Sequence, residues 1–494
     1  DDRGGDCKSG SVWQGPISSI VFDAADVRDV LRDLDRPCHI VLYQGRVGVT
    51  QEGVGQTVSL SKTNQSDHII HLLTSPPTPP QRLGDPLFLA TYNLDYAYMT
   101  GSMANAIASE AMVIALGQHG LLGAFGAGGL PPQRLEAAIQ QIQAALPHGP
   151  YAFNLIHSPN EPALERNAVD LYLKHGVTTV EASAYLRLTP AIVRYRVAGL
   201  ALNEDNQIEI HNRVIAKLSR REVAEQFLKP APAKLVQALV EQGKVTPLQA
   251  RMAEHVPMAD DITVEADSGG HTDNRPLVCL LPSIIALRDQ VQMQYKYAVP
   301  VRIGAAGGIG TPASALGAFM MGAAYIVTGS INHSCVEAGT SDHVKALLAQ
   351  ATMTDVMMAP AADMFEMGVN LQVLKRGTLF PLRARKLYEL YQAYDSIEQI
   401  PTEEREKLER QVFQRDLASV WEDCVAFFSE RDPTQIERAR DNPKRKMALV
   451  FRWYVGLAPR WGIAGEPGRE LDYQIWCGPA MGAFNDWVRG SYLE

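Results

Sequence analysis

A regular alternation of short apolar segments with amphipathic helices between about residues 87 and 328 constrains the fold more than any other feature. Eight segments have the length and apolar character of buried strands: residues 87–91, 121–125, 151–156, 177–182, 213–217, 262–266, 300–305 and 324–328. Helical spacing fills most of the gaps, for example over residues 135–146 and 163–175. This alternation predicts a parallel α/β domain, and eight strands fit a TIM (β/α)8 barrel. A doubly wound sheet, which needs fewer strands, is the alternative.

Changes in this pattern divide the chain into three predicted regions. Residues 1–83 alternate β-rich segments, such as 39–43 and 58–60, with polar turns, and a proline-rich stretch follows them. The barrel is predicted over residues 84–345. Strands are expected to stop there, and residues 346–494 are predicted to be a mostly helical C-terminal region.

The spacing of the barrel is interrupted once, between the fifth and sixth predicted strands. Residues at about 218–260 carry extra helical sequence there. Loops at the C-terminal ends of barrel strands build the active site of such proteins, so this helical insertion is expected to form a wall or lid of the substrate site.

The last two predicted strands both end in small residues, which are Ala306, Gly307 and Gly308 after one strand and Gly329 and Ser330 after the other. Thr311 followed by Pro312 predicts the N-terminus of a helix just after the first of these turns. Backbone amides and helix N-termini bind anions, and the last two loops of a (β/α)8 barrel commonly hold a phosphate. The sequence therefore predicts a cofactor that carries a phosphate.

A histidine follows the sixth predicted strand, in the sequence EADSGGH at residues 265–271. Gly269 and Gly270 would let the backbone approach a flat ligand closely, while the imidazole of His271 projects over it. A histidine placed in this way can donate a proton near neutral pH. A lone histidine in a glycine turn can also simply cap the next helix, but its position one unit before the phosphate loops favours a catalytic role.

Three other features have two interpretations each. Asn154, in an otherwise apolar strand, either bonds neighbouring backbone or meets a heteroaromatic ring. Lys217, at the end of the fifth strand, is either an ordinary barrel-edge lysine or a cation beside a ring or phosphate. The glycines of residues 120–129 do not match a dinucleotide fingerprint and are better explained as a strand with a tight turn that faces a ligand.

Composition limits the compartment and the partners. A net charge of −9 argues against nucleic acid, and no apolar run approaches the ~20 residues of a membrane span. The N-terminal sequence lacks the pattern of a secretion signal. The six cysteines never form a CxxC pair, which suits a reducing cytosol rather than a disulfide framework or a zinc site. We therefore expect a soluble cytoplasmic protein without a metal centre.

The motifs resemble those of a known group of flavin enzymes. AAGGIG at 305–310, VTGS at 327–330, EADSGGH at 265–271 and FNLI at 153–156 are similar to the FMN-dependent barrels of nitronate monooxygenases and flavin enoyl-acyl-carrier-protein reductases. A longer block, residues 357–391, looks like the PfaD-type trans-acting enoyl reductases of polyunsaturated-fatty-acid and polyketide synthases. The resemblance covers about residues 85–494, and FMN and the substrate class come from it alone.

The resemblance implies which residues hold FMN. Its phosphate is expected at Gly307, Gly308, Gly329 and Ser330, beside Ala306; its ring and ribityl chain at Thr91, Asn154 and Lys217; and the border of the ring at Asp267, Gly269 and Gly270. The sequence departs from the simpler barrels after the first predicted strand, where they have a glycine–methionine segment and this chain has Tyr92 and Asn93.

The implied reaction passes a hydride from NADPH through FMN to the β-carbon of a 2-enoyl thioester on an acyl carrier protein. His271 is the first candidate for the proton donor, and Tyr92 or a water is the alternative. Because carrier proteins of this kind are acidic, the chain should offer a basic docking patch. The candidates are residues 437–446, with Arg438, Arg440, Lys444, Arg445 and Lys446, and residues 374–386, although either can be an ordinary solvated helix face.

Two rival functions remain compatible with these residues. A nitronate monooxygenase-type oxidase would use the same FMN barrel and the same histidine, but it needs neither NADPH nor a long C-terminal region. A non-catalytic scaffold would need no open phosphate site. A homodimer is the expected assembly only because dimers are the commonest soluble oligomers.

Overall fold

The computed structural model describes residues 9–59, 69–159 and 161–493, so Cys7 and Leu60 lie outside the described residues. Two compact units are formed, Asp1–Leu83 and Gly84–Glu494. The first is an antiparallel sheet of order β3-β2-β5-β1-β4 with one α-helix, α1 (Ala24–Arg32). Its strands are β1 (Ser9–Gln14), β2 (Cys38–Tyr43), β3 (Arg46–Thr50), β4 (Val54–Ser59) and β5 (Ile70–Ser75). The prediction of a small β-rich N-terminal segment is confirmed.

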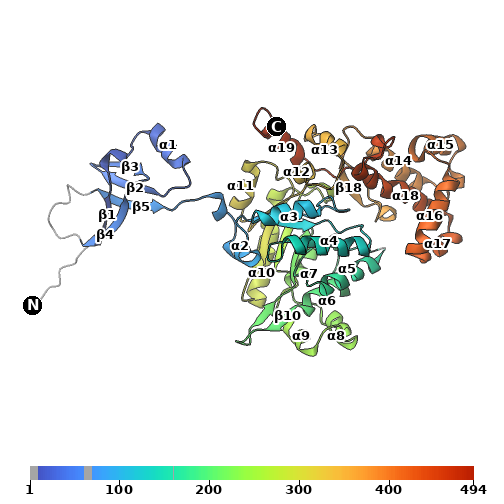
Figure 1. The fold of residues 1–494 in the computed structure, drawn as a ribbon, viewed down its shortest axis with the longest axis horizontal. Helices are drawn as coiled ribbons and strands as arrows, with labels where there is room; N and C mark the ends of the chain where they lie inside the picture. The colour runs from blue at the N-terminus through green and yellow to red at the C-terminus, as the bar shows by residue number, and fades with distance from the viewer. Residues whose placement is uncertain (1–8, 60–68, 160, 494) are drawn as a thin grey trace, which may run out of the picture. The chain divides into compact units, whose positions relative to one another are not determined.

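The second unit contains a closed barrel of eight parallel strands, which confirms the predicted fold (Figure 1). In barrel order the strands are β6 (Tyr98–Thr100), β7 (Leu122–Phe125), β8 (Ala152–Ile156), β9 (Thr179–Ser183), β12 (Arg213–Leu218), β13 (Asp261–Glu265), β15 (Arg302–Ala306) and β16 (Ile326–Thr328). The connections carry the helices α3 (Glu110–Gln118), α4 (Pro132–Ala145), α5 (Pro162–Lys174), α6 (Pro190–Ala198), α7 (Arg221–Leu228), α10 (Leu277–Tyr295), α11 (Pro312–Met320) and α12 (Ser330–His333).

The prediction of a strand over residues 87–91 is wrong, because these residues lie in helix α2 (Pro86–Tyr92). The Asp85 carboxylate accepts a hydrogen bond from the Leu87 amide, and Pro86 occupies the first helical turn. These two signals start a helix whatever the apolar content of the run. The first barrel strand, β6, begins only at Tyr98.

Helix α2 covers the end of the barrel at which the strands begin. Its Phe88 stacks on Tyr325 with ring centroids 4.1 Å apart. Asp261 and Arg302 are the first residues of β13 and β15, and they form a buried two-pronged ion pair at 2.6 and 2.8 Å. The hydroxyl of Tyr92 donates to the same Asp261 carboxylate at 2.5 Å. The N-terminal end of the barrel is therefore closed by structural contacts.

The helical insertion between β12 and β13 is confirmed, but the expectation that it covers the substrate site is wrong. Helices α8 (Ala233–Glu241) and α9 (Pro247–Met252) follow α7 and so belong to the connection that returns to the start of β13. Helix α8 packs on α6, and α9 packs on β10 (Leu200–Leu202) of the short hairpin with β11 (Ile208–Ile210). In Figure 1 both helices lie at the end of the barrel away from the C-terminal helices.

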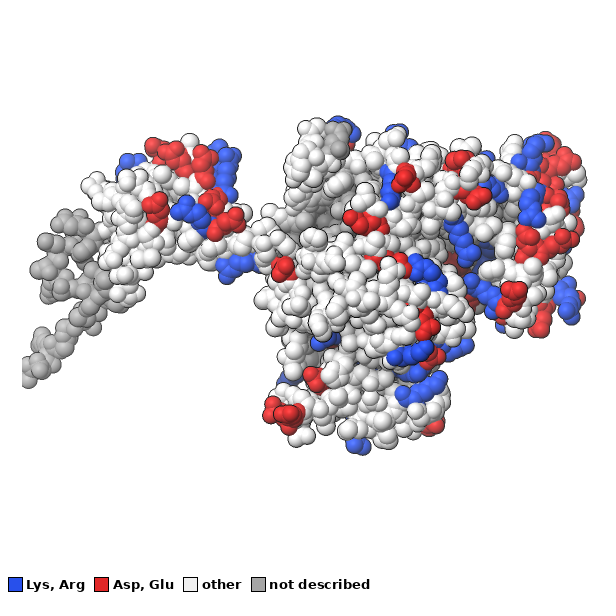
Figure 2. Space-filling view, in the orientation of Figure 1, with Lys and Arg blue, Asp and Glu red and all other residues white. Residues whose placement is uncertain are grey.

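The region after residue 345 is mostly helical, as predicted, but the expectation that strands stop there is wrong. Strands β17 (Val356–Pro360) and β18 (Asn370–Leu374) form a three-stranded sheet with β14 (Gly270–His271), in the order β14-β18-β17. The helices are α13 (Asp342–Ala349), α14 (Phe380–Ala393), α15 (Thr402–Leu408), α16 (Leu417–Arg431), α17 (Pro433–Arg440), α18 (Pro443–Ala464) and α19 (Ala480–Val488). Figure 2 shows basic and acidic side chains close together over α15–α17. None of the helices among the described residues has the length and apolarity that a bilayer span requires.

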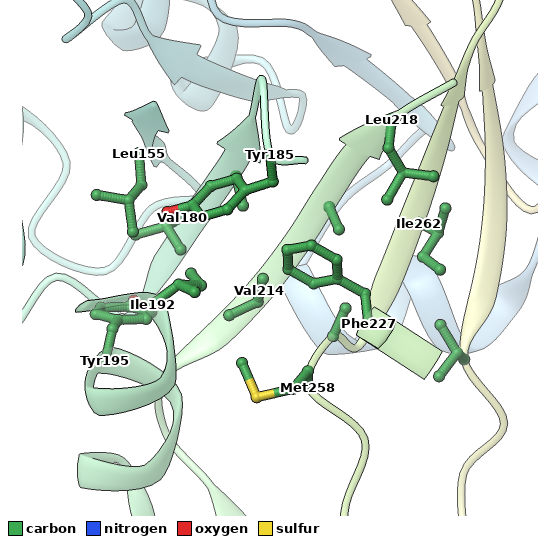
Figure 3. Packing of buried hydrophobic residues seen from close by; sticks show 14 of the residues in the cluster. Leu155, Val180, Tyr185, Ile192, Tyr195, Val214, Leu218, Phe227, Met258 and Ile262 are labelled. Carbon is green, nitrogen blue, oxygen red and sulfur yellow. The ribbon is translucent and has the colours of Figure 1, made fainter. Parts of the chain in front are cut away.

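The core of the second unit lies between the barrel strands and their surrounding helices. Figure 3 shows Val180 and Val214 from the strands packed against Ile192 of α6 and Phe227 of α7. A separate cluster fills the C-terminal helical region and includes Phe380, Phe451 and Tyr454. These two packed layers fix the strand ends on one side and α16 and α18 on the other, and the cavities lie between them.

Candidate active site

A cavity of about 380 Å³ opens between the C-terminal ends of the barrel strands and the helices α16 and α18. From the barrel it is lined by Asn154, Lys217, Gly269, Gly270 and His271, among others. The glycine turn predicted to face a ligand contributes Gly128 and Gly129. The opposite wall comes from the C-terminal region, with Phe428, Trp453 and Trp476. The wall that the sequence assigned to the insertion is thus built by the C-terminal helices.

A smaller pocket of about 80 Å³ adjoins the first and shares Ser102, Lys217 and Gly269 with it. Its lining holds the other predicted cofactor residues except Thr91: Asp267, Ala306, Gly307, Gly308, Gly329 and Ser330. Gly307 has φ +87, and a Cβ there would meet the carbonyl carbon of Ala266 at 2.7 Å. Only glycine fits at that position, which keeps the turn after β15 close against the turn after β13.

The residues of this smaller pocket suit a phosphate. A Cβ at Gly308 or Gly329 would meet nothing within 4 Å, so both backbones border open space. His333, which is 2% exposed, also lines the pocket. Its Nδ1 donates to the carbonyl of Trp476 at 3.1 Å, while its Nε2 has no hydrogen-bond partner among the described residues. A bound phosphate would favour the protonated imidazole, whose Nε2–H could then donate to a phosphate oxygen.

With no anion beside it, burial lowers the pKa of His333 to about 4, so the imidazole is then neutral at physiological pH. The sequence analysis missed this residue, since nothing in the run after VTGS marks one polar side chain as buried. The fit to FMN therefore rests on the open glycine backbones and on this buried polar atom.

Lys217 lies between two carboxylates at the strand ends below the cavity. Its Nζ is 3.5 Å from Glu181 and 3.9 Å from Glu265. The backbone and hydroxyl of Ser102 both donate to the Glu181 carboxylate. Burial lowers the pKa of Lys217, but the two carboxylates outweigh this effect and raise it above its ordinary value. Lys217 is thus a fixed cation at the junction of the two pockets, and not an ordinary edge lysine.

Asn154 is 3% exposed, and its amide Nδ2 donates to the Glu181 carbonyl at 3.1 Å and to the Ser183 hydroxyl at 2.8 Å. It therefore bonds neighbouring groups and also lines the large cavity, so the two interpretations offered by the sequence are compatible.

His271 makes its closest polar contact with a residue that the sequence analysis did not single out. Its Nε2 lies 3.2 Å from a carboxylate oxygen of Asp363, ninety-two positions further along the chain. The pairing of β14 with β18 brings the two segments together. Burial alone lowers the pKa of His271, but the Asp363 carboxylate more than offsets it and leaves that pKa above its ordinary value. The same pair holds the pKa of Asp363 below its ordinary value, although burial acts in the opposite direction.

The loop that carries His271 is fixed from the C-terminal region. The amide of Gln372 donates to the Asp267 carboxylate at 2.7 Å and to the Ser268 carbonyl at 2.8 Å. A Cβ at Gly269 would meet the Cys477 amide nitrogen at 2.8 Å, so this glycine is required by close backbone packing. Contacts from β18 and from Cys477 therefore hold this loop in place.

Thr91 lies away from the other predicted residues. Its hydroxyl accepts from Arg302 at 2.7 Å, at the opposite end of the barrel, and it lines neither pocket. Tyr92 is held at that end by Asp261, so it cannot be the alternative proton donor. Thr91 and Tyr92 are predicted at the site only because the first strand is predicted at residues 87–91. The true strand, β6, is followed by Gly101, Ser102 and Met103, a glycine–methionine segment that lines the pockets.

Neither basic segment forms a free patch. Lys444 donates to the backbone carbonyl of Tyr391, and Arg445 forms an ion pair with Glu366. In the second segment Arg376 is paired with Asp355, and Arg383 with Asp472. Charge reversal at these positions would break internal contacts, so it cannot test docking. Arg438 and Arg440 remain exposed.

Comparison with known families gives three matches along the chain. A model of the nitronate monooxygenase family matches residues 90–393. A model of the fatty acid synthase subunit PfaD N-terminal domain matches residues 13–77. The inserted helical domain of [acyl-carrier-protein] S-malonyltransferase matches residues 394–473.

Several proteins are similar over most of the chain. One polyunsaturated fatty acid synthase subunit of a Thraustochytrium species is 54% identical over 83% of this chain and 28% of its own length. The polyketide biosynthesis protein PksE of Bacillus subtilis is 48% identical over 84% of this chain and 54% of its own. The chain thus spans about half or less of these relatives. The crystal structure of the MlnA enoyl reductase domain from Bacillus amyloliquefaciens matches with 41% identity and a TM-score of 0.80, over 84% of this chain and 93% of that one.

Proposed function

Since the chain belongs to the nitronate monooxygenase family, and within it to the PfaD-type enoyl reductases, we propose that it reduces the 2,3-double bond of enoyl thioesters in trans. The thioester is carried by an acyl carrier protein of a polyketide or polyunsaturated fatty acid synthase. FMN is the resident cofactor and NADPH the reductant. The observation that carries the proposal is the His271–Asp363 pair, which lies in a cavity continuous with a phosphate cradle.

Bound FMN would supply the hydride chemistry, from NADPH to the β-carbon of the enoyl thioester. Gly307, Gly308, Gly329 and Ser330 would hold its phosphate, with Ala306 beside them. Asn154 and Lys217 would lie at the ring, and Asp267, Gly269 and Gly270 would border it. Thr91 is not part of this proposal.

His271 supplies the proton that the α-carbon needs once the hydride has been added. Asp363 accepts at Nε2 and so orients the ring, which leaves Nδ1 as the nitrogen that can face the substrate. The raised pKa keeps a larger share of the imidazole protonated near neutral pH, as a general acid requires. The apolar wall of α16 and α18 excludes water from this proton transfer.

Anaerobic stopped-flow absorbance tests the proposal. The purified chain, loaded with FMN, is reduced with NADPH and then mixed with crotonyl thioester on a carrier protein. Rapid return of the oxidised flavin spectrum is the expected result. Reoxidation only after O₂ is admitted would favour the nitronate monooxygenase-type oxidase. A preparation that binds no FMN would leave the non-catalytic scaffold.

Replacement of Asp363 by Asn should shift the pH profile of thioester reduction. The reaction needs protonated His271, so its rate falls as pH rises through the pKa of that residue. Loss of the neighbouring carboxylate lowers this pKa, so the fall should move towards acid. The measurement is the rate of thioester-dependent flavin reoxidation from pH 5.5 to 9. Asp289→Asn, at an exposed ion pair on α10, is the control and should leave the profile in place. An unshifted profile for Asp363→Asn would show that this carboxylate does not set the protonation of the acid.

A further inference from the structure

The mouth of the large cavity carries two arginines. Among the residues that line this cavity, Gly129, Arg431 and Arg460 are exposed, which places them where it opens to solvent. Arg431 ends α16, and Arg460 lies in α18 just after Pro459. The two helices that form the apolar wall thus each bring one guanidinium to the rim.

The positive charge at this rim is not balanced by the protein. The Arg431 guanidinium donates twice to one oxygen of Glu161, at 2.6 and 3.0 Å. Arg460 makes no hydrogen bond or ion pair with any described residue. The pKa of Arg460 lies below its ordinary value because the group is partly desolvated and because Arg431 is near, although the Glu161 carboxylate acts in the opposite direction. Two guanidinium groups share one carboxylate, so an anion bound between them would be favourable.

The passage from this rim to His271 has the opposite character. Its C-terminal wall is mostly apolar, with Phe428, Leu449, Trp453, Val455 and Leu457, and the guanidinium of Arg452 in the same wall is paired with Glu366. Such a wall suits an uncharged chain and offers no ion pair to a charged one. The site therefore selects a ligand with one anionic end, an apolar or neutral middle and a reactive end at His271.

We propose that Arg431 and Arg460 bind a phosphate ester at the mouth of the cavity, on a ligand whose other end reaches His271. This inference rests on the proposed function, which offers two such ligands. One is the phosphopantetheine arm that would carry the enoyl thioester, and the other is the phosphorylated nicotinamide nucleotide. Both present a phosphate some distance from the reacting group, and guanidinium groups recognise phosphate through paired N–H donors.

A substrate pair that differs only in the phosphate provides the test. Crotonyl-phosphopantetheine and crotonyl-pantetheine are compared as substrates of the FMN-loaded full chain and of Arg460→Gln. We expect kcat/KM to fall about tenfold for the phosphorylated thioester only. Arg166→Gln, an exposed arginine of α5 that lines neither cavity, is the charge-matched control and should behave as wild type. Arg460→Lys keeps the charge and should recover part of the loss.

The remaining outcomes distinguish the phosphopantetheine arm from the nucleotide as the ligand, and they separate this inference from the proposed function. A rise in KM for NADPH but not for NADH, with both thioesters unaffected, would assign the rim to the nucleotide. Equal rates of Arg460→Gln and wild type with every substrate would overturn the inference. If the wild type reduces neither thioester, calorimetric titration with 4′-phosphopantetheine still tests whether the rim binds a phosphate. Weaker binding by Arg460→Gln than by Arg166→Gln would support the phosphate site while the proposed function fails.

Discussion

The His271→Ala variant is expected to bind FMN as the wild type does, yet to reduce enoyl thioesters about 10²–10⁴ times more slowly. The imidazole lines the large cavity and not the phosphate pocket, so its loss leaves the cradle intact. A water that replaces it could deliver the proton only without the orientation and raised pKa that Asp363 provides. The measurement is the anaerobic rate of flavin reoxidation by crotonyl thioester, with FMN content determined from absorbance in the same sample.

His211→Ala is the matched control, because the His211 imidazole is half-exposed, pairs with Glu209 and lines neither cavity. Its rate should equal that of the wild type. His271→Gln should stay as slow as His271→Ala, since an amide fills similar space but cannot transfer a proton. An undiminished rate in both His271 variants would remove this residue from the mechanism and leave a water as the donor.

The parts of the site that follow strand ends could be predicted from the sequence. The glycines after β15 and β16 directly follow apolar runs, Lys217 lies near the end of β12, and His271 lies just beyond β13. Parallel strands of a barrel end on the same face. Their convergence therefore follows once the strands are placed correctly. That they bind FMN still rests on the resemblance and on the fit of the pocket, and the division of residues 84–494 into a barrel and a helical domain remains a prediction.

The wrong prediction of the first strand shows where inference from apolar runs fails. Residues 87–91 are as apolar as a buried strand, but Asp85 and Pro86 start a helix there, and Tyr98–Thr100 is too short and too polar to stand out. Thr91 was assigned to the site only through this misplaced strand. An N-cap aspartate followed by proline is a stronger local signal for a helix than a short apolar run is for a strand.

The contacts between distant segments could not be predicted. Asp363 reaches His271, and Gln372 reaches Asp267, only because β18 adds to the two-residue strand β14. Arg431 and Arg460 meet at the cavity because α16 and α18 pack together. No local pattern marks these residues, since each is an ordinary polar side chain on its own element. The tertiary packing of the C-terminal region determines these contacts.

Gly329 offers the sharpest way to test the phosphate cradle without disturbing the fold. Its φ of −138 lies outside the left-handed region, and a Cβ there would meet nothing within 4 Å. It precedes α12 as the N-cap, a position where aspartate is favoured. A Gly329→Asp variant is therefore expected to fold. Its carboxylate would fill the space where the phosphate would bind and would repel the phosphate charge.

Gly329→Asp should bind FMN at least about 100-fold more weakly than the wild type. The loss of two charge-assisted hydrogen bonds to the phosphate is worth roughly 3 kcal/mol or more, and repulsion between two anions adds to it. Quenching of flavin fluorescence by the apoprotein measures the dissociation constant, and circular dichroism checks the fold. Gly317→Asp adds the same charge at an exposed, open position on α11, so it should bind FMN normally. Riboflavin, which lacks the phosphate, should bind both variants about equally. Normal FMN binding by a folded Gly329→Asp would place the phosphate elsewhere, and the cradle would lose its assigned role.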